Sequence, residues 1–207
     1  GKDFVVAHPD CDRQGLLVAL LRGSFEYQGQ KCSAASRAYI PSSVWDSIGE
    51  DLCSEVGKIK MGDARDFSNF MTAVIDQRAF DKISGYIDRA KSDDSCEVVS
   101  GGGSDDSNGW FIEPTIIVTS NPVSETMCEE IFGPVLTIYV YEDDDFEGAL
   151  GMCDTGSPYA LTGSIFANNE EDVQRAFEVL RFAAGNFYIN DKPTGAVVAQ
   201  QPFGGAR

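Results

Sequence analysis

The sequence predicts an α/β fold, with an open, largely parallel, twisted sheet flanked by helices. Short apolar runs such as 4–7 and 135–141 alternate along the chain with segments whose apolar residues recur every three or four positions. This alternation is typical of βαβ units, whose strands run parallel. No internal repeat or linker divides the 207 residues, so we expect a single domain over 1–207.

Strands are expected where β-branched and aromatic residues form short apolar runs between turn residues. The first run ends at His8-Pro9. Pro114 separates two later runs, because proline lacks the N–H that a central ladder needs. The expected strands are 4–7, 37–40, 96–99, 110–112, 115–118, 135–141, 161–166 and 186–189.

Helices are expected where apolar residues recur at helical spacing behind a residue that can cap the first turn. The expected helices are 16–25, 44–56, 80–90, 124–130, 144–152 and 173–180. Their expected caps are, in order, Asp10 or Asp12, Ser42 or Ser43, Asp76, Ser124, Asp143 or Asp144, and Asn169. The last helix has the expected apolar stripe Val173, Phe177 and Leu180. Glycine reaches positive φ without steric cost, so helices are expected to end at Gly29, Gly57 and Gly185.

The charge and composition exclude several classes of partner and site. With 16 basic and 33 acidic residues, the net charge of −17 argues against binding to nucleic acid or an anionic membrane surface. No apolar run approaches the roughly 20 residues that a membrane helix needs. The six cysteines show no metal-ligand spacing and indicate a reducing compartment. With His8 as the only histidine, no metal site is expected.

Cys32 is the residue best placed to carry chemistry. It follows the helix-breaking Gly29 and precedes the strand expected at 37–40, so it lies at a junction where a rigid scaffold can present a reactive side chain. The adjacent Lys31 and nearby backbone N–H groups would favour the thiolate. The ordinary alternative is a buried apolar cysteine. A Cys–His pair is a further, weaker alternative, with His8 as its single candidate partner.

Four motifs resemble those of the aldehyde dehydrogenase superfamily and occur in the same order. Gly1-Lys2 resembles the end of the Glu-x-Gly-Gly-Lys motif, and Gly29-Gln30-Lys31-Cys32 resembles the nucleophile motif. The segments 129–135 and 201–205 resemble the Glu-x-Phe-Gly-Pro cofactor motif and the late Pro-Phe-Gly-Gly motif. The resemblance therefore spans the whole chain and implies the catalytic domain of that superfamily.

The resemblance implies a role for each matching residue. Cys32 would be the catalytic nucleophile. Glu130 would bind the nicotinamide ribose hydroxyls of NAD and Phe132 would pack near the nicotinamide, where their ordinary alternatives are an exposed carboxylate and a core aromatic. The substrate's α-carboxylate would be held by Ser33, Gly195 and Ala196, although many relatives carry serine at the last position. Phe203 would pack against the aliphatic part of the substrate.

Within the superfamily, the segments 25–34 and 186–196 resemble enzymes that oxidise glutamate semialdehyde to glutamate with NAD in proline breakdown. The alternatives are another aldehyde as substrate, or a scaffold module without catalysis. The resemblance also implies a homo-oligomer in the mitochondrial matrix. The NAD-binding domain, the glutamate base, the asparagine oxyanion donor and the assembly segment are expected outside 1–207, so the isolated chain is expected to be inactive.

Overall fold

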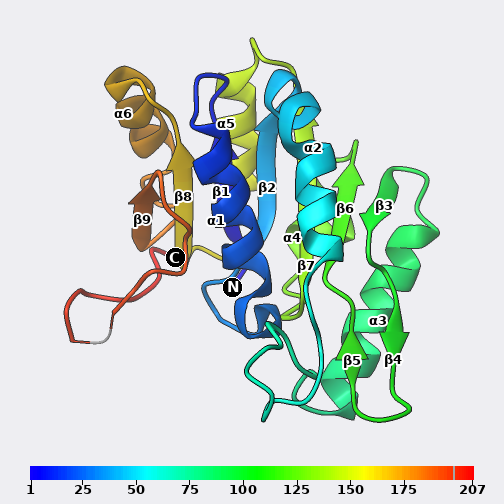
Figure 1. The fold of residues 1–207 in the computed structure, drawn as a ribbon. Helices are drawn as coiled ribbons and strands as arrows, with labels where there is room; N and C mark the ends of the chain where they lie inside the picture. Colours follow the sequence, from blue (N-terminus) through cyan, green and yellow to red (C-terminus); the bar gives the residue numbers. More distant parts are fainter. Residues whose placement is uncertain (198) are drawn as a thin grey trace.

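In the computed structural model, which describes residues 1–197 and 199–207, seven strands form one sheet between two layers of helices (Figure 1). These strands are β1 Asp3–Ala7, β2 Ala35–Pro41, β3 Cys96–Ser100, β6 Thr115–Thr119, β7 Val135–Tyr141, β8 Thr162–Phe166 and β9 Asn186–Ile189. Their order is β3-β6-β7-β2-β1-β8-β9. Only β3, at the edge, runs antiparallel to its neighbour, so the predicted largely parallel sheet is confirmed.

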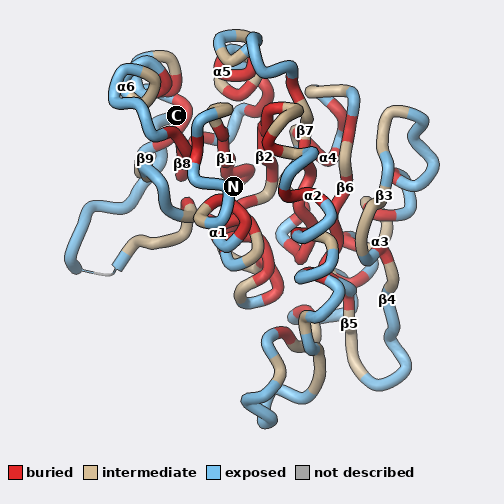
Figure 2. The backbone as a smooth tube through the Cα atoms, turned by 45° about the horizontal axis from the view of Figure 1, so that its top comes forward, coloured by how far each residue is buried: buried red, intermediate tan, exposed pale blue. Residues whose placement is uncertain are grey.

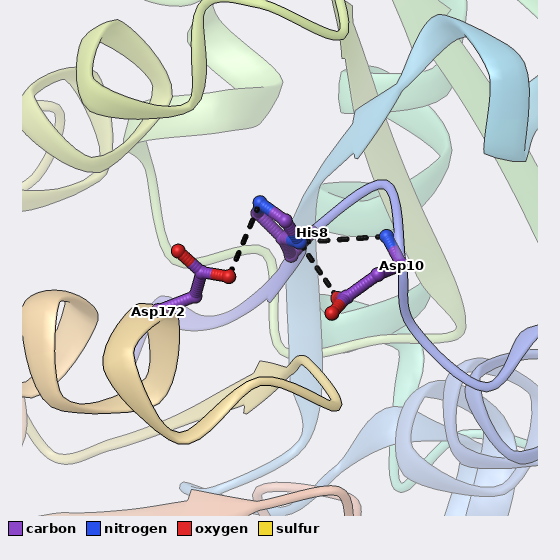
Figure 3. Close-up of side chains that lie close together, drawn as sticks. All are labelled: His8, Asp10 and Asp172. Carbon is purple, nitrogen blue, oxygen red and sulfur yellow. Dashed lines mark hydrogen bonds and ion pairs between the residues drawn. The ribbon is translucent and has the colours of Figure 1, made fainter.

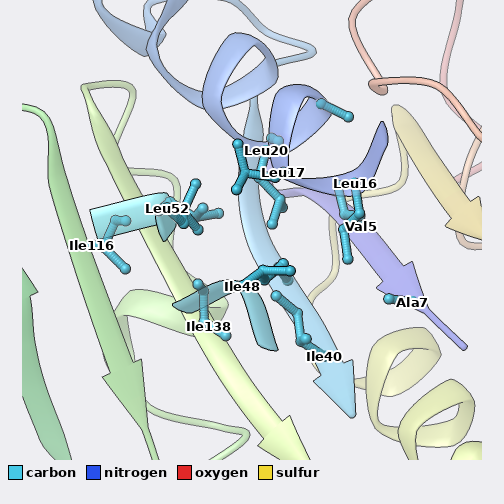
Figure 4. Close-up of a cluster of buried hydrophobic side chains, with 14 of the residues drawn as sticks. Val5, Ala7, Leu16, Leu17, Leu20, Ile40, Ile48, Leu52, Ile116 and Ile138 are labelled. Atoms are coloured by element: carbon cyan, nitrogen blue, oxygen red, sulfur yellow. The ribbon is translucent and has the colours of Figure 1, made fainter. Parts of the chain in front are cut away.

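The helices lie on both faces of this sheet (Figure 1). They are α1 Arg13–Phe25, the 3-10 helix η1 Glu26–Gly29, α2 Ser42–Gly57, α3 Gln77–Lys91, α4 Glu125–Cys128, α5 Phe146–Thr155 and α6 Glu170–Val179. α1 and α2 cover one face, and their leucines and isoleucines pack on the strands (Figure 4). α5 and α6 pack on the opposite face, and α3 packs there against β6 and β7.

The packing of β1 explains why residues 4–7 are continuously apolar. Val5 and Ala7 pack under α1 and α2, whereas Phe4 and Val6 pack on the side of α5 and α6. Because successive side chains of a strand point to opposite faces, apolar residues at 4–7 bury against the helices on both sides of the sheet. All five residues of β1 are buried, as are most residues of the central strands (Figure 2).

A small two-stranded sheet stands apart from the main one. Its strands are β4 Ser104–Asp105 and β5 Phe111–Ile112, which pair antiparallel. β4 was not expected, because its two exposed residues lie in a polar loop after three glycines and carry no strand pattern. β4 is stabilised by its hydrogen-bonded pairing with β5, because its own residues have low strand propensity.

Three of the expected helix caps are confirmed. The carboxylate of Asp12 accepts a hydrogen bond from the Gln14 N–H, and Asn169 caps α6 in the same way through the Glu171 N–H. Asp76 accepts from the Ala79 N–H at 2.8 Å and caps α3. Each satisfies a backbone donor that the first turn of a helix leaves without an intrahelical partner.

The expected caps of α2 and α5 are wrong. Asp145, not Asp143 or Asp144, accepts from the Gly148 N–H and caps α5. Asp143 instead reaches the start of α2, where its carboxylate accepts from the Ser43 N–H at 3.0 Å and from the Ser42 hydroxyl at 3.2 Å. β2 and β7 are parallel neighbours, so the residues that follow them meet at the same edge of the sheet. Sequence spacing could not reveal a cap supplied from another segment.

Three further expectations need correction. Ser124 stands at the N-cap position of α4, but its side chain makes no capping hydrogen bond. α6 ends at Val179, well before Gly185. Phe177 is 45% exposed instead of lying in the apolar stripe, and its ring packs edge-on against Phe187.

Among the described residues, no helix combines the length and apolar character needed to cross a bilayer.

We expect Asp143→Ala to lower the free energy of unfolding by about 0.5–2 kcal/mol, the usual cost of losing a helix cap. Denaturant unfolding of the protein that contains this chain measures it. Asp144→Ala is the matched control, because the neighbouring carboxylate is also exposed but caps no helix. Equal losses in the two variants would contradict the cap.

Candidate active site

The loop that carries Cys32 begins with an unusual backbone. Tyr27, Gln28 and Gly29 have φ values of 57°, 59° and 63°. The predicted break at Gly29 is therefore part of a longer left-handed run. A left-handed non-glycine residue costs about 1–3 kcal/mol and persists only where its surroundings hold it.

Neighbouring segments hold this loop through named contacts. The side-chain carbonyl of Gln28 accepts from the Thr72 N–H at 3.1 Å, and that of Gln30 accepts from the Ile75 N–H at 3.0 Å. A β-carbon on Gly29 would collide with the carbonyl oxygen of Gly133. The absence of a side chain at Gly29 therefore lets the loop touch the segment of the expected cofactor motif.

Cys32 is exposed, lying between η1 and β2. The buried-cysteine alternative is therefore wrong for this residue. Cys11 and Cys153 are buried cysteines of that ordinary kind. Burial raises the pKa of the Cys11 thiol to about 11 and that of the Cys153 thiol to about 12. Thiols of that kind are inert near neutral pH, whereas an exposed thiol can react.

The groups around Cys32 differ from those expected. The Lys31 ammonium lies 3.1 Å from the Glu26 carboxylate, so its charge is partly neutralised by that contact. Within residues 1–197 and 199–207, the Cys32 backbone N–H donates no hydrogen bond to another protein group. That N–H remains available as a donor to an oxygen on a molecule attached to Cys32.

His8 cannot serve Cys32 as a base, so the Cys–His alternative is wrong. A β-carbon on Gly1, just before β1, would overlap the Cys32 carbonyl oxygen, so Cys32 lies at the amino end of β1. His8 follows the carboxyl end of that strand, about 16 Å away along five residues.

His8 is instead held between two carboxylates (Figure 3). Its Nδ1 lies 2.6 Å from Asp10 Oδ1, and its Nε2 lies 3.7 Å from Asp172 Oδ2. One possible ligand atom from each of His8, Asp10 and Asp172 lies within 4.8 Å of the other two, but exposed acidic groups commonly gather in this way without a metal ion. The contacts of His8 with Asp10 and Asp172 connect the end of β1 to α6.

A cavity of about 700 Å³ opens beside Cys32. The nucleophile loop, the expected cofactor motif and the last segment of the chain all contribute to its wall. The lining residues are Gln30, Lys31, Cys32, Ser33, Phe132, Thr194, Ala196, Val197, Ala199, Gln201 and Phe203. The predicted residues Cys32, Ser33, Phe132, Ala196 and Phe203 are thus brought together, whereas Glu130 and Gly195 lie off the wall.

Thr194 is a lining residue that the sequence reasoning missed. The Ser33 hydroxyl donates to the Thr194 hydroxyl oxygen at 3.0 Å, which ties the nucleophile loop to the last segment. Its position directly before the predicted Gly195-Ala196 pair was the available signal. Hydroxyl and backbone N–H donors at this point can together bind a small carboxylate.

The residues expected to bind the cofactor lie at the same edge of the sheet. Phe132 is 41% exposed with a φ of 61°, so it is not a core aromatic. The Glu130 carboxylate accepts a hydrogen bond from the Gly1 nitrogen, and the Glu130 carbonyl accepts from Lys82 at 2.7 Å. A partly exposed carboxylate and an exposed ring beside the cavity of Cys32 fit the nicotinamide riboside end of a dinucleotide.

Two buried basic side chains, Lys2 and Arg37, fix the first residues of the chain next to this site. Lys2 donates to the Ser36 hydroxyl at 2.8 Å, and the Arg37 guanidinium donates to the Lys2 carbonyl at 3.0 Å. Burial lowers the pKa of Lys2 to about 7, and Arg37 acts in the same direction. These contacts join the start of β1 to β2, so they hold Gly1 next to Cys32.

The chain is similar to a well-defined group of proteins. A profile described as "Aldehyde dehydrogenase family" matches residues 1–207. The chain is 56% identical over 207 residues to "Delta-1-pyrroline-5-carboxylate dehydrogenase, mitochondrial" of Dictyostelium discoideum and 49% identical over 208 residues to the protein of that name in Homo sapiens. In both cases the alignment covers 100% of this chain and 37% of the relative.

A solved structure agrees with this similarity. The delta-pyrroline-5-carboxylate dehydrogenase from Mycobacterium tuberculosis, crystallised bound with NAD, superimposes with a TM-score of 0.93 and 51% sequence identity. The match covers 99% of this chain and 37% of that one. The chain therefore spans a little over a third of the length of these relatives.

We expect Gly29→Ala to lower the free energy of unfolding by about 1–3 kcal/mol, because the new β-carbon would strain a left-handed residue and collide with Gly133. Denaturant unfolding measures the loss. Gly151→Ala is the control, since a β-carbon there meets nothing within 4 Å and alanine favours the helix α5. A Gly29 variant as stable as the control would show that the contact is unimportant.

Proposed function

Because the chain belongs to the aldehyde dehydrogenase family, we propose that the protein containing it oxidises L-glutamate 5-semialdehyde to L-glutamate with NAD as the oxidant. One observation carries the proposal: the exposed Cys32 thiol opens into a cavity whose wall also includes Phe132, Ser33 and Thr194. A nucleophile, a residue of the cofactor motif and carboxylate-binding hydroxyls thus meet in one place. The substrate assignment rests on the similarity to delta-1-pyrroline-5-carboxylate dehydrogenases.

Cys32 begins the reaction as the nucleophile. Its thiolate sulfur attacks the aldehyde carbon, forms a C–S bond and shifts the carbonyl electron pair onto oxygen. The Cys32 backbone N–H, which donates to no described protein group, can donate to that oxyanion. Cysteine suits this step because even a small thiolate fraction is strongly nucleophilic.

Oxidation leaves the acyl group on Cys32. NAD, when bound, supplies the chemistry of hydride acceptance from the substrate carbon. The thioester on Cys32 is then hydrolysed by water, which releases glutamate and restores the thiol. A general base must take the proton of that water. We assign the base to the part of the relatives' length that this chain does not span.

The substrate's α-carboxylate would be held by the last segment of the chain together with the nucleophile loop. Ser33 already donates to Thr194, so the Thr194 hydroxyl hydrogen is left to donate to a carboxylate. The backbone N–H groups of Gly195 and Ala196 follow directly. Ala196 has no hydroxyl, and Thr194 can supply that donor instead. Phe203, 48% exposed on the cavity wall, would contact the substrate's methylene groups.

NAD would be held on the other side of Cys32. The Glu130 carboxylate can accept hydrogen bonds from two adjacent ribose hydroxyls. The exposed face of Phe132 would pack near the nicotinamide and exclude water from it. In this proposal 1–207 is the catalytic domain, and the remaining length of the relatives supplies the rest of the nucleotide site.

The cellular setting follows from the same relatives. Several of them carry "mitochondrial" in their names, which supports a mitochondrial protein. We also propose that the reaction, as a step of proline breakdown, takes place in the mitochondrial matrix and that the full-length protein assembles into a homo-oligomer. Neither nucleic acid nor a membrane is a proposed partner of this acidic chain.

We expect Cys32→Ala to reduce glutamate semialdehyde oxidation by at least about a thousandfold, because the covalent route is lost. NADH formation by the full-length protein measures it, and Cys53→Ala, at a half-buried cysteine that does not line the cavity, should retain activity. A higher kcat/KM for succinate semialdehyde or acetaldehyde would overturn the substrate assignment. No oxidation of any aldehyde by the wild type would favour a scaffold module.

We expect Glu130→Gln to raise the KM for NAD by about tenfold, because hydrogen bonds to an ionised acceptor are lost. Initial rates at saturating aldehyde give this value. Glu129→Gln is the control, since the neighbouring carboxylate is exposed. An unchanged KM for NAD in the Glu130 variant would place the ribose elsewhere.

A further inference from the structure

We propose that Glu26 is a positioning residue: its carboxylate fastens the segment 192–197, which carries the substrate-side donors, to the loop of Cys32. This role deepens the proposed function and rests on it. The carboxylate accepts hydrogen bonds from Lys192 at 2.9 Å and from Lys31 at 3.1 Å, both on the same oxygen, and Arg22 donates to its other oxygen. One side chain therefore joins α1, the residue next to Cys32 and the last segment.

The site of Glu26 is built to hold a charged carboxylate. Its side chain is only 15% exposed, so these contacts are better shielded than ordinary surface ion pairs. Burial opposes the charged form, but the hydrogen bonds from Lys192, Lys31 and Arg22 outweigh it and lower the pKa of Glu26 to about 2. The carboxylate thus stays ionised throughout the neutral pH range.

The end of α1 forms a seat for the segment that Glu26 holds. A β-carbon on the buried Gly23 would come within 3.4 Å of the Lys192 β-carbon and within 3.6 Å of the Pro193 ring. Lys192 stands two residues before Thr194, whose hydroxyl accepts from Ser33. Within the described residues 192–197, two side chains form hydrogen bonds to the segment 26–33: Lys192 donates to Glu26, and Thr194 accepts from Ser33.

The direction of the KM change on neutralising Glu26 distinguishes a positioning role from simple electrostatic attraction of the substrate. Glu26 with its three cationic partners carries a net charge of about +2, beside a cavity proposed to bind a carboxylate. Neutralising Glu26 would make this region more positive and, by electrostatics alone, would lower the KM by favouring the α-carboxylate end of the zwitterionic substrate. Loss of positioning would raise that KM. The two effects have opposite signs.

The test compares Glu26→Gln with wild type in the full-length protein. We expect the KM for glutamate semialdehyde to rise about tenfold while kcat changes less, since the donors of 194–196 are no longer held in place. The rate of Cys32 alkylation by the neutral reagent iodoacetamide should stay within about threefold, because Gln28, Gln30 and Gly133 still hold the nucleophile loop. Lys192→Met should reproduce the effect, and the double variant should be no worse than either single one.

Glu55→Gln is the matched control, because Glu55 pairs with Lys58 at 2.7 Å on the surface of α2. It should leave the KM unchanged. A KM in Glu26→Gln that is unchanged or lower overturns the positioning role, as does an equal collapse of alkylation rate and turnover. Failure of the wild type to oxidise glutamate semialdehyde overturns the proposed function itself.

Discussion

The close approach of Gly29 to the Gly133 carbonyl is the constraint on which the site depends. Only a residue without a β-carbon fits there. The contact brings two distant segments together, so that Cys32 and Phe132 reach the same cavity. Its cost is a left-handed run through Tyr27 and Gln28, which is held because the Gln28 and Gln30 side chains accept hydrogen bonds from the Thr72 and Ile75 N–H groups. The reactive loop is therefore stable only as part of the whole fold.

Parallel strands explain why these segments meet. Gly1 precedes β1, Cys32 precedes β2 and Phe132 precedes β7, and these three strands are adjacent and parallel. Their amino ends lie at one edge of the sheet, so the residues just before them converge there. In open α/β sheets the carboxyl ends more often carry the ligand. Here that opposite edge holds His8 and the cap that Asp143 provides for α2, which are structural contacts.

Much of the architecture was predictable because the spacing of apolar residues along a segment indicates whether it forms a strand or a helix. The strand 135–141 and the helix with Phe80, Ile83 and Ile87 show clear apolar spacing, and both form as expected. β4 has no such pattern and depends on pairing with β5. The cap of α2 comes from Asp143, and Thr194 joins the site by contact with Ser33. Each of these depends on residues far apart in sequence, which local spacing cannot encode.

Hydrophobic periodicity and short motifs are local properties, so the α/β class, the order of most elements and the motif residues around Cys32 could be predicted from the sequence. The tertiary structure alone decided that Cys32 is exposed, that Lys31 is engaged by Glu26, and that His8 lies at the far end of β1. Exposure and charge pairing are set by which segments pack together. That packing is fixed only when the parallel sheet places their ends at one edge.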